Sequence, residues 1–141
     1  MTENSKVTGH VIIKYLTVEE ILEIHDEILQ FGGSKGVANE GAISLIVDLA
    51  TERFSVIGEE SVIKKASLLL YELMARHPFI DGNKRTAFVT CKIFLEANGY
   101  GLYYSVDEAE KLALGVAAGI KSRNYAEKWI SKHVKLGRKT P

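Results

Sequence analysis

The feature of this 141-residue sequence that most constrains its fold is a pair of apolar, helix-periodic runs separated by a short polar stretch. The first run, residues 61–76, is apolar on nearly every face, which is typical of a helix in the middle of a domain. The second run, residues 84–97, has apolar residues at helical spacing and ends at an Asn-Gly turn signal. Pro78 disfavours helix at His77, so the first helix must end there. We expect two central helices that pack together, with a loop between them.

Start signals and apolar periodicity predict four more helices around this pair. A capping box, in which Ser or Thr is followed three residues later by Glu, occurs at Thr17 and at Ser105. Asn124, three residues before Glu127, is predicted to cap the last helix. The predicted helices cover residues 17–31, 42–50, 61–76, 84–97, 105–119 and a final run that begins at 124.

The remaining segments are short. We predict an extended segment over 11–16, an irregular link over 51–60, a turn over 98–101, a strand over 102–104, and frayed ends before 11 and after 134. Six helices with almost no strand predict an all-α fold, a compact helical bundle that forms one domain over residues 1–141 with its core at about 15–134. A chain of this length can bury a sizeable core without disulfides.

Composition excludes several classes of protein. The chain has 18 basic and 18 acidic residues, so bulk charge gives it no general affinity for nucleic acid or membranes, and we expect no direct nucleic-acid binding. Its single cysteine, Cys91, lies in an apolar helical run and is predicted to be a packing residue. A polar N-terminus and the absence of a long apolar run predict a cytoplasmic protein.

The loop between the central helices holds an unusual density of polar chemistry. Residues 77–86 read HPFIDGNKRT, with an imidazole, a carboxylate and two adjacent cations. Lys84 and Arg85 fall in the first turn of the second helix, where cations oppose the helix dipole and unpaired N–H groups attract anions. A phosphate-sized ligand would resolve that conflict. The alternative is a structural cap network formed by His77, Asp81 and Arg85.

Two other features have a functional and a structural interpretation. Residues 32–36 read GGSKG, which a phosphate-cradling loop could also show, but the spacing of a nucleotide-binding P-loop is absent and a flexible connector is the better interpretation. His25 and Asp26 lie on the first predicted helix, where a satisfied polar pair at the edge of the core is favoured over a functional role.

The stretch HPFIDGNKR, residues 77–85, matches the signature H-x-F-x-[DE]-[AG]-N-[GK]-R, and the chain thereby resembles the Fic/Doc family. Lysine before the last arginine is similar to the Doc, or death-on-curing, branch. The resemblance extends to residues 15–17, 24–26 and 32–33 and to the segment from 94 to 99. It implies a compact Fic-type helical bundle of about six helices with the motif loop at a helix N-terminus.

The resemblance also implies a role for each residue of the motif. His77 would be the catalytic general base, since imidazole can accept a proton near neutral pH. Asp81 would hold Mg²⁺ and Phe79 would anchor the loop in the core. The residues that would bind the nucleotide phosphates are Gly82, Asn83, Lys84 and Arg85. In this family a flap holds the protein target, and by chain position it would be Gly33, Ser34, Lys35, Gly36 and Val37.

Two positions depart from the branch of the family that transfers AMP. That branch has glycine where this chain has Lys84, and a second arginine where it has Phe88. The resemblance therefore favours Doc chemistry, in which the γ-phosphate of ATP passes to a serine or threonine hydroxyl of a protein; the best-known target is elongation factor Tu. The alternatives are AMP transfer by a Fic-type nucleotidyltransferase, and a degenerate module that only binds nucleotide or a partner.

The family also supplies a regulator. Many Fic enzymes carry an inhibitory helix with the pattern [ST]-x-x-x-E-[GN]. The nearest match here, at residues 55–59, is followed by Glu60, so we interpret it as a coincidence. The resemblance then implies a growth-inhibiting toxin that is neutralised by a separate antitoxin of the Phd type.

Overall fold

We describe the fold from a computed structural model of the protein, in which residues 13–52 and 59–137 are placed. This part of the chain contains six helices and two three-residue strands. The elements are α2 (Val18–Leu29), α3 (Glu40–Glu52), α4 (Glu59–Ala75), α5 (Asn83–Ala97), β1 (Tyr100–Leu102), α6 (Val106–Ala117), α7 (Arg123–His133) and β2 (Val134–Leu136). The predicted all-α bundle is confirmed.

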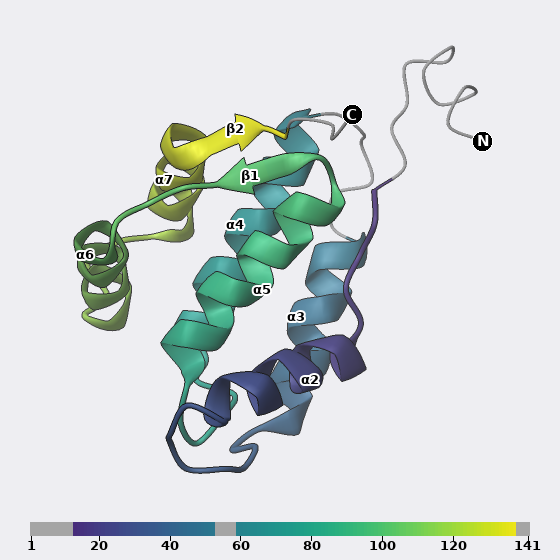
Figure 1. The fold of residues 1–141 in the computed structure, drawn as a ribbon, viewed down its shortest axis with the longest axis vertical. Helices are drawn as coiled ribbons and strands as arrows, with labels where there is room; N and C mark the ends of the chain where they lie inside the picture. The colour runs from purple at the N-terminus through teal and green to yellow at the C-terminus, as the bar shows by residue number, and fades with distance from the viewer. Residues whose placement is uncertain (1–12, 53–58, 138–141) are drawn as a thin grey trace.

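Helices α4 and α5 form the centre of the bundle (Figure 1). Helix α4 packs against α5, α7, α3 and α6, while α2 packs against α5 and α3. Ala66, Leu70 and Leu73 on α4 have no exposed surface, nor do Phe94 and Leu95 on α5. The apolar surface of the two predicted runs is thus the core itself, and the loop that joins them emerges at one end of the pair, beside α2.

Both predicted capping boxes are present and fix where their helices begin. Thr17 accepts a hydrogen bond from the Glu20 N–H at 3.1 Å, and the Glu20 carboxylate accepts one from the Thr17 N–H at 2.8 Å. Ser105 and Glu108 make the same pair of bonds, at 3.1 and 2.7 Å. Because each box satisfies N–H groups that the first helical turn leaves unpaired, these two starts could be predicted from sequence alone.

The predicted N-cap of the last helix was wrong. Ser122, not Asn124, is the N-cap of α7, and its hydroxyl accepts a hydrogen bond from the Tyr125 N–H at 3.3 Å. Serine is as good a cap as asparagine, and the choice of Ser122 adds helical residues at the start of α7.

The predictions for the strands and links also need correction. The strand is Tyr100–Leu102, which begins inside the predicted turn at 98–101 and shares only Leu102 with the predicted strand at 102–104. It pairs antiparallel with Val134–Leu136, where a frayed end was expected after residue 134. The expected link over 51–60 is helical at both ends, in α3 and α4. Residues 53–58 lie outside the described residues, as do residues 1–12 and 138–141. The near match to the inhibitory pattern, at 55–59, therefore falls almost entirely outside the described residues.

Cys91 is fully buried on α5, and burial raises the pKa of its thiol, as expected for a packing residue. None of the helices in the described ranges is both long and apolar enough to cross a membrane.

Candidate active site

The loop between α4 and α5 places His77 at the surface in a strained backbone conformation. His77 is exposed and has φ +48°, the single positive φ of a non-glycine residue in the described part of the chain. A residue in this left-handed region costs on the order of 1–3 kcal/mol and persists only where the surroundings enforce it. Here Pro78 and Phe79, both buried, fix the chain immediately after it. Such strain is common at active sites.

Phe79 is buried, as predicted for the anchor of the loop, and it stacks on a histidine from α2. The rings of Phe79 and His25 lie 3.7 Å apart and almost parallel, at 8°. Nε2 of His25 lies 2.8 Å from the backbone carbonyl oxygen of Asp81, so the ring donates a hydrogen bond to it in the tautomer with the proton on Nε2. His25 is 3% exposed. It is therefore the buried support of the motif loop, while its neighbour Asp26 is exposed.

The structure thus predicts a graded effect of substitutions at His25. His25→Phe keeps the stacked ring but loses the bond to the Asp81 carbonyl, which should cost about 1 kcal/mol of unfolding free energy. His25→Ala also loses the ring and should cost roughly 3 kcal/mol, as expected for a large side chain removed from a core. Urea unfolding measures both values. The matched control, Asp26→Asn, should change stability by less than about 0.5 kcal/mol. A His25→Phe protein as stable as the wild type would contradict the role of the hydrogen bond, and equal losses for Phe and Ala would contradict the role of the stacked ring.

The Asp81 carboxylate is oriented by two backbone groups. Its Oδ1 accepts a hydrogen bond from the Gly82 N–H at 2.7 Å, and its Oδ2 accepts one from the Ser34 N–H at 3.1 Å. These two bonds, with the nearby Arg85 guanidinium, lower the pKa of the Asp81 carboxyl below its ordinary value. The carboxylate is therefore ionised at neutral pH.

Gly82 is the N-cap of α5 and has the left-handed conformation, φ +83°, that glycine adopts without strain. It provides no side-chain cap, so the first-turn N–H groups of α5 lack that partner. The side chain of Asn83 braces the loop: Oδ1 accepts from the Phe79 N–H at 2.9 Å and Nδ2 donates to the Phe79 carbonyl at 2.8 Å. The phosphate-binding role of Asn83 stays a prediction.

The start of α5 borders a polar hollow of about 320 Å³, which we call the α5 hollow. It is lined by Ile80, Asp81, Gly82, Asn83, Lys84 and Arg85. Arg85 donates a hydrogen bond through Nη2 to the carbonyl oxygen of Gly32 at 3.2 Å. All four predicted phosphate-binding residues and the predicted metal ligand therefore surround one space.

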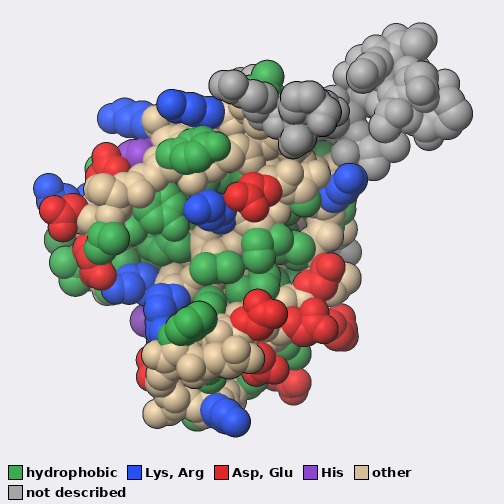
Figure 2. All heavy atoms as spheres, in the orientation of Figure 1, with side chains coloured by type: hydrophobic (Ala, Val, Ile, Leu, Met, Phe, Trp, Pro, Cys, Tyr) green, Lys and Arg blue, Asp and Glu red, His purple; other side chains and the backbone are tan. Residues whose placement is uncertain are grey.

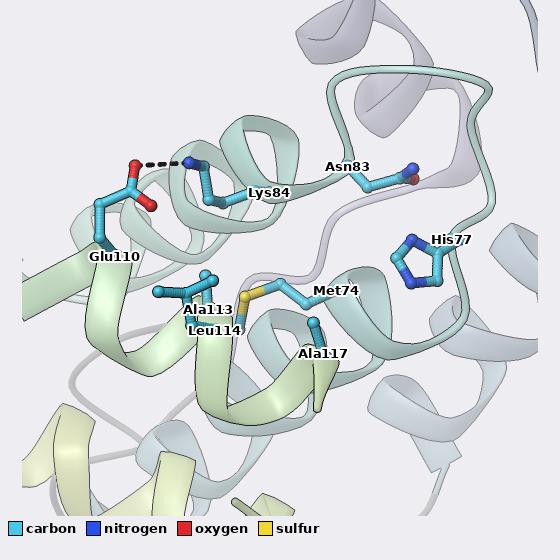
Figure 3. Close-up of a pocket in the computed structure, with 8 residues that line it drawn as sticks. All are labelled: Met74, His77, Asn83, Lys84, Glu110, Ala113, Leu114 and Ala117. Atoms are coloured by element: carbon cyan, nitrogen blue, oxygen red, sulfur yellow. Dashed lines mark hydrogen bonds and ion pairs between the residues drawn. The ribbon is translucent and has the colours of Figure 1, made fainter. Parts of the chain in front are cut away.

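A second pocket, of about 180 Å³, lies between the motif loop and α6, and we call it the α6 pocket. Its lining residues are Met74, His77, Asn83, Lys84, Glu110, Ala113, Leu114 and Ala117. Figure 3 shows His77 and Asn83 on one side, and Lys84 extended towards Glu110 on the other. Lys84 Nζ lies 2.6 Å from Glu110 Oε2. Sequence reasoning did not find Glu110, because nothing in its local pattern links it to a residue 26 positions earlier.

The glycine-rich segment lies against the motif loop. Val37 and Phe79 form an antiparallel bridge, in which the Ile80 N–H donates to the Gly36 carbonyl at 3.1 Å. At Gly33, φ is +124° and an added Cβ would lie 3.0 Å from the Asp81 carboxylate and 2.9 Å from Leu29, so only glycine fits without a shift. The predicted flap residues Gly33, Ser34, Lys35, Gly36 and Val37 are all exposed. The segment is therefore an exposed edge beside the motif, whichever function it serves.

Known proteins are similar to this chain over much of its length. Residues 15–95 match the sequence profile of the Fic/DOC family. The chain is 28% identical over 108 residues to "Protein kinase doc" of Escherichia phage P1, across 76% of this chain and 85% of that protein. It is 35% identical over 109 residues to "Toxin Doc" of Mycolicibacterium smegmatis (strain ATCC 700084 / mc(2)155), across 74% of this chain and 81% of that protein.

Proposed function

This chain belongs to the Fic/DOC family, and from that premise we propose that it is a Doc-type toxin that transfers the γ-phosphate of ATP to a Ser or Thr hydroxyl of a protein. One observation carries the proposal: the complete motif forms one loop and the first turn of α5, with His77 and Asp81 in the loop and Lys84 and Arg85 in the helical turn that follows. Cations and first-turn N–H groups at one helix start favour a phosphate ligand.

The α5 hollow is the part of the site that suits the phosphates of ATP. Uncapped N–H groups of the first turn of α5 and the Arg85 guanidinium border it, and both interact favourably with phosphate oxygens. Charge stabilisation of this kind is the main contribution that a protein makes to phosphoryl transfer.

Asp81 fits a Mg²⁺ ion that arrives with the nucleotide. Mg²⁺ at nucleotide sites is usually bound by one or two carboxylates together with phosphate oxygens and water. The protein offers one such group, the ionised Asp81 carboxylate; among the described residues no three His, Cys, Asp or Glu side chains are grouped as a metal site of their own. When bound, Mg²⁺ neutralises charge on the phosphates.

The proposed reaction is an in-line displacement at the γ-phosphorus. The target hydroxyl oxygen forms a bond to phosphorus while the bond between phosphorus and the β–γ bridging oxygen breaks, and ADP leaves. His77 takes the proton of the attacking hydroxyl. Its exposed position at the mouth of the α6 pocket leaves the ring accessible to a side chain of another protein.

The protein substrate is proposed to bind along the exposed edge of residues 33–37. Val37 on that segment bridges Phe79, two residues from His77, so an added acceptor strand would lie along a segment that packs against the motif loop. Elongation factor Tu, the best-known target of this chemistry, is the first acceptor to test.

This proposal predicts a selective effect of substitutions in the flap. Lys35→Ala should raise KM for the protein acceptor severalfold while leaving KM for ATP nearly unchanged, because Lys35 is exposed on the segment that would hold the acceptor. Steady-state kinetics with each substrate varied in turn measures both constants. Lys14→Ala, an exposed lysine on a different segment, is the matched control, and equal changes in the two KM values would identify residues 33–37 as a connector only.

A partner of the Phd type is proposed to cover an apolar groove next to the site. The groove, about 420 Å³, lies between α2, α5 and α6 and includes Phe31, which is 88% exposed, and Val106, which is 77% exposed. Figure 2 shows hydrophobic side chains gathered between α5 and α6, with Lys and Arg side chains at the lower end of this surface. An exposed apolar surface beside cations suits an antitoxin segment that carries acidic residues.

Label transfer tests the proposed function directly. The purified protein, ATP and Mg²⁺ are incubated with elongation factor Tu or a cell extract, and a protein acceptor should gain label from the γ-position. Label from the α-position would favour the AMP-transferring alternative. Nucleotide binding without transfer to any acceptor in the extract would favour a binding module.

A further inference from the structure

Lys84 is the one charged residue that borders all three of the spaces around the motif described above. It lines the α5 hollow, the α6 pocket and the apolar groove. Its side chain extends towards α6, where Nζ and Glu110 Oε2 are 2.6 Å apart (Figure 3). In this arrangement the ammonium group is held by α6.

Glu110 is well placed to control which of these spaces the Lys84 ammonium group enters. It also lines the α6 pocket and the groove, and it is the single carboxylate among the lining residues of either. The two side chains are 45% and 47% exposed, so water screens the pair and a competing anion can separate it. A phosphate group offers Lys84 more negative charge than one carboxylate does.

We propose that Glu110 is a positioning residue that keeps the Lys84 ammonium group directed towards α6, and not into the α5 hollow, until a phosphate group displaces the Glu110 carboxylate. The inference rests on the proposed function, because it takes the phosphates of ATP to be the displacing group. Before binding, the pair reduces the positive charge that the hollow presents. After binding, Glu110 loses its partner. Glu110 thus opposes nucleotide binding, and its effect is exerted through Lys84.

The inference predicts that Glu110→Gln tightens binding. With ATP and Mg²⁺, calorimetry should give a Kd about two- to fivefold lower than that of the wild type, the size expected for a half-exposed ion pair. Asp107→Asn removes a charge from the first turn of the same helix and is the matched control. It should change Kd much less, because Asp107 lines none of the three spaces.

A double-substitution cycle tests whether the effect passes through Lys84. In Lys84→Met, which keeps a long side chain without charge, Glu110→Gln should change Kd no more than Asp107→Asn does. A Glu110→Gln protein that binds ATP equally or more weakly overturns the inference. So does a gain that persists in Lys84→Met, since it would come from the field of Glu110 alone.

Tripolyphosphate separates this inference from the proposed function, because it has the phosphates of ATP without ribose or base. If it binds with the same dependence on Lys84 and Glu110 while ATP with Mg²⁺ does not bind, the ATP-dependent function fails and the inference holds for a polyphosphate ligand. If ATP binds to the wild type and no variant differs, the inference fails alone. Failure of both probes to bind overturns both.

Discussion

Replacing His77 is expected to abolish most of the transfer activity and leave the protein folded. Loss of a general base typically lowers the rate by roughly 100- to 10,000-fold, and His77 is the base in the proposed reaction. The ring is exposed, so its removal takes little from the core. The bracing contacts of the loop, from Phe79 to His25 and Asn83, do not involve His77.

The choice of variant follows from the backbone at this position. At φ +48°, alanine would add backbone strain, whereas asparagine tolerates the left-handed region and cannot act as a base. We therefore expect His77→Asn and His77→Ala to be equally inactive, with His77→Asn closer to wild type in stability. Turnover is measured as label transferred to the acceptor, and thermal unfolding confirms the fold. A folded His77→Asn protein with wild-type turnover would remove His77 from the mechanism.

Local signals allowed most of the fold to be predicted. The capping boxes at Thr17 and Ser105 act within four residues, so the sequence contains all that specifies them. The buried faces of α4 and α5 follow from apolar periodicity in the same way. The β1–β2 pair could not be predicted from sequence, because a three-residue strand such as Tyr100–Leu102 depends on a partner more than thirty residues away.

In the candidate site, too, the local interactions could be predicted from the sequence and the long-range interactions could not. The motif residues are neighbours in sequence, so their presence at one helix start could be predicted. Their partners could not: His25 reaches Asp81 across 56 residues, and Glu110 reaches Lys84 across 26. Asn83 is the informative case, since the sequence predicted a phosphate contact for it but not the two hydrogen bonds that join its side chain to the backbone of Phe79. A polar residue at an active site can be a brace for the loop as readily as a ligand contact.

The position of the transferred label is the prediction that decides between the two chemistries of the family. We expect label from the γ-position of ATP and none from the α-position. Lys84 occupies volume at the start of α5 that glycine would leave free, and this raises the energy of a pose that presents the α-phosphate to the target. Since about 1.4 kcal/mol changes a rate tenfold, a few kcal/mol of obstruction is enough to determine the product.

Phe88 gives a second reason to expect no transfer of AMP. The AMP-transferring branch has arginine at this position, but here the ring is 5% exposed and packs against Tyr104 and Trp129 at centroid distances of 5.3 and 5.9 Å. Arginine in that aromatic cluster would bury a charge, so Phe88→Arg should destabilise the protein instead of completing a phosphate clamp. The cluster thus excludes the second arginine from this chain, and the switch of chemistry has to be tested at Lys84 alone.

Two variants of Lys84 separate the volume of its side chain from its charge. Lys84→Met keeps the volume and loses the charge, so γ-transfer should fall roughly tenfold or more with no α-transfer. Lys84→Gly loses both, so γ-transfer should fall as far and α-label should begin to appear on the acceptor. Parallel assays with α- and γ-labelled ATP measure the two products in each protein. Incorporation of α-label by the wild type would replace the kinase with the nucleotidyltransferase alternative. Incorporation of α-label by Lys84→Met as readily as by Lys84→Gly would show that the volume of the Lys84 side chain does not select the phosphate.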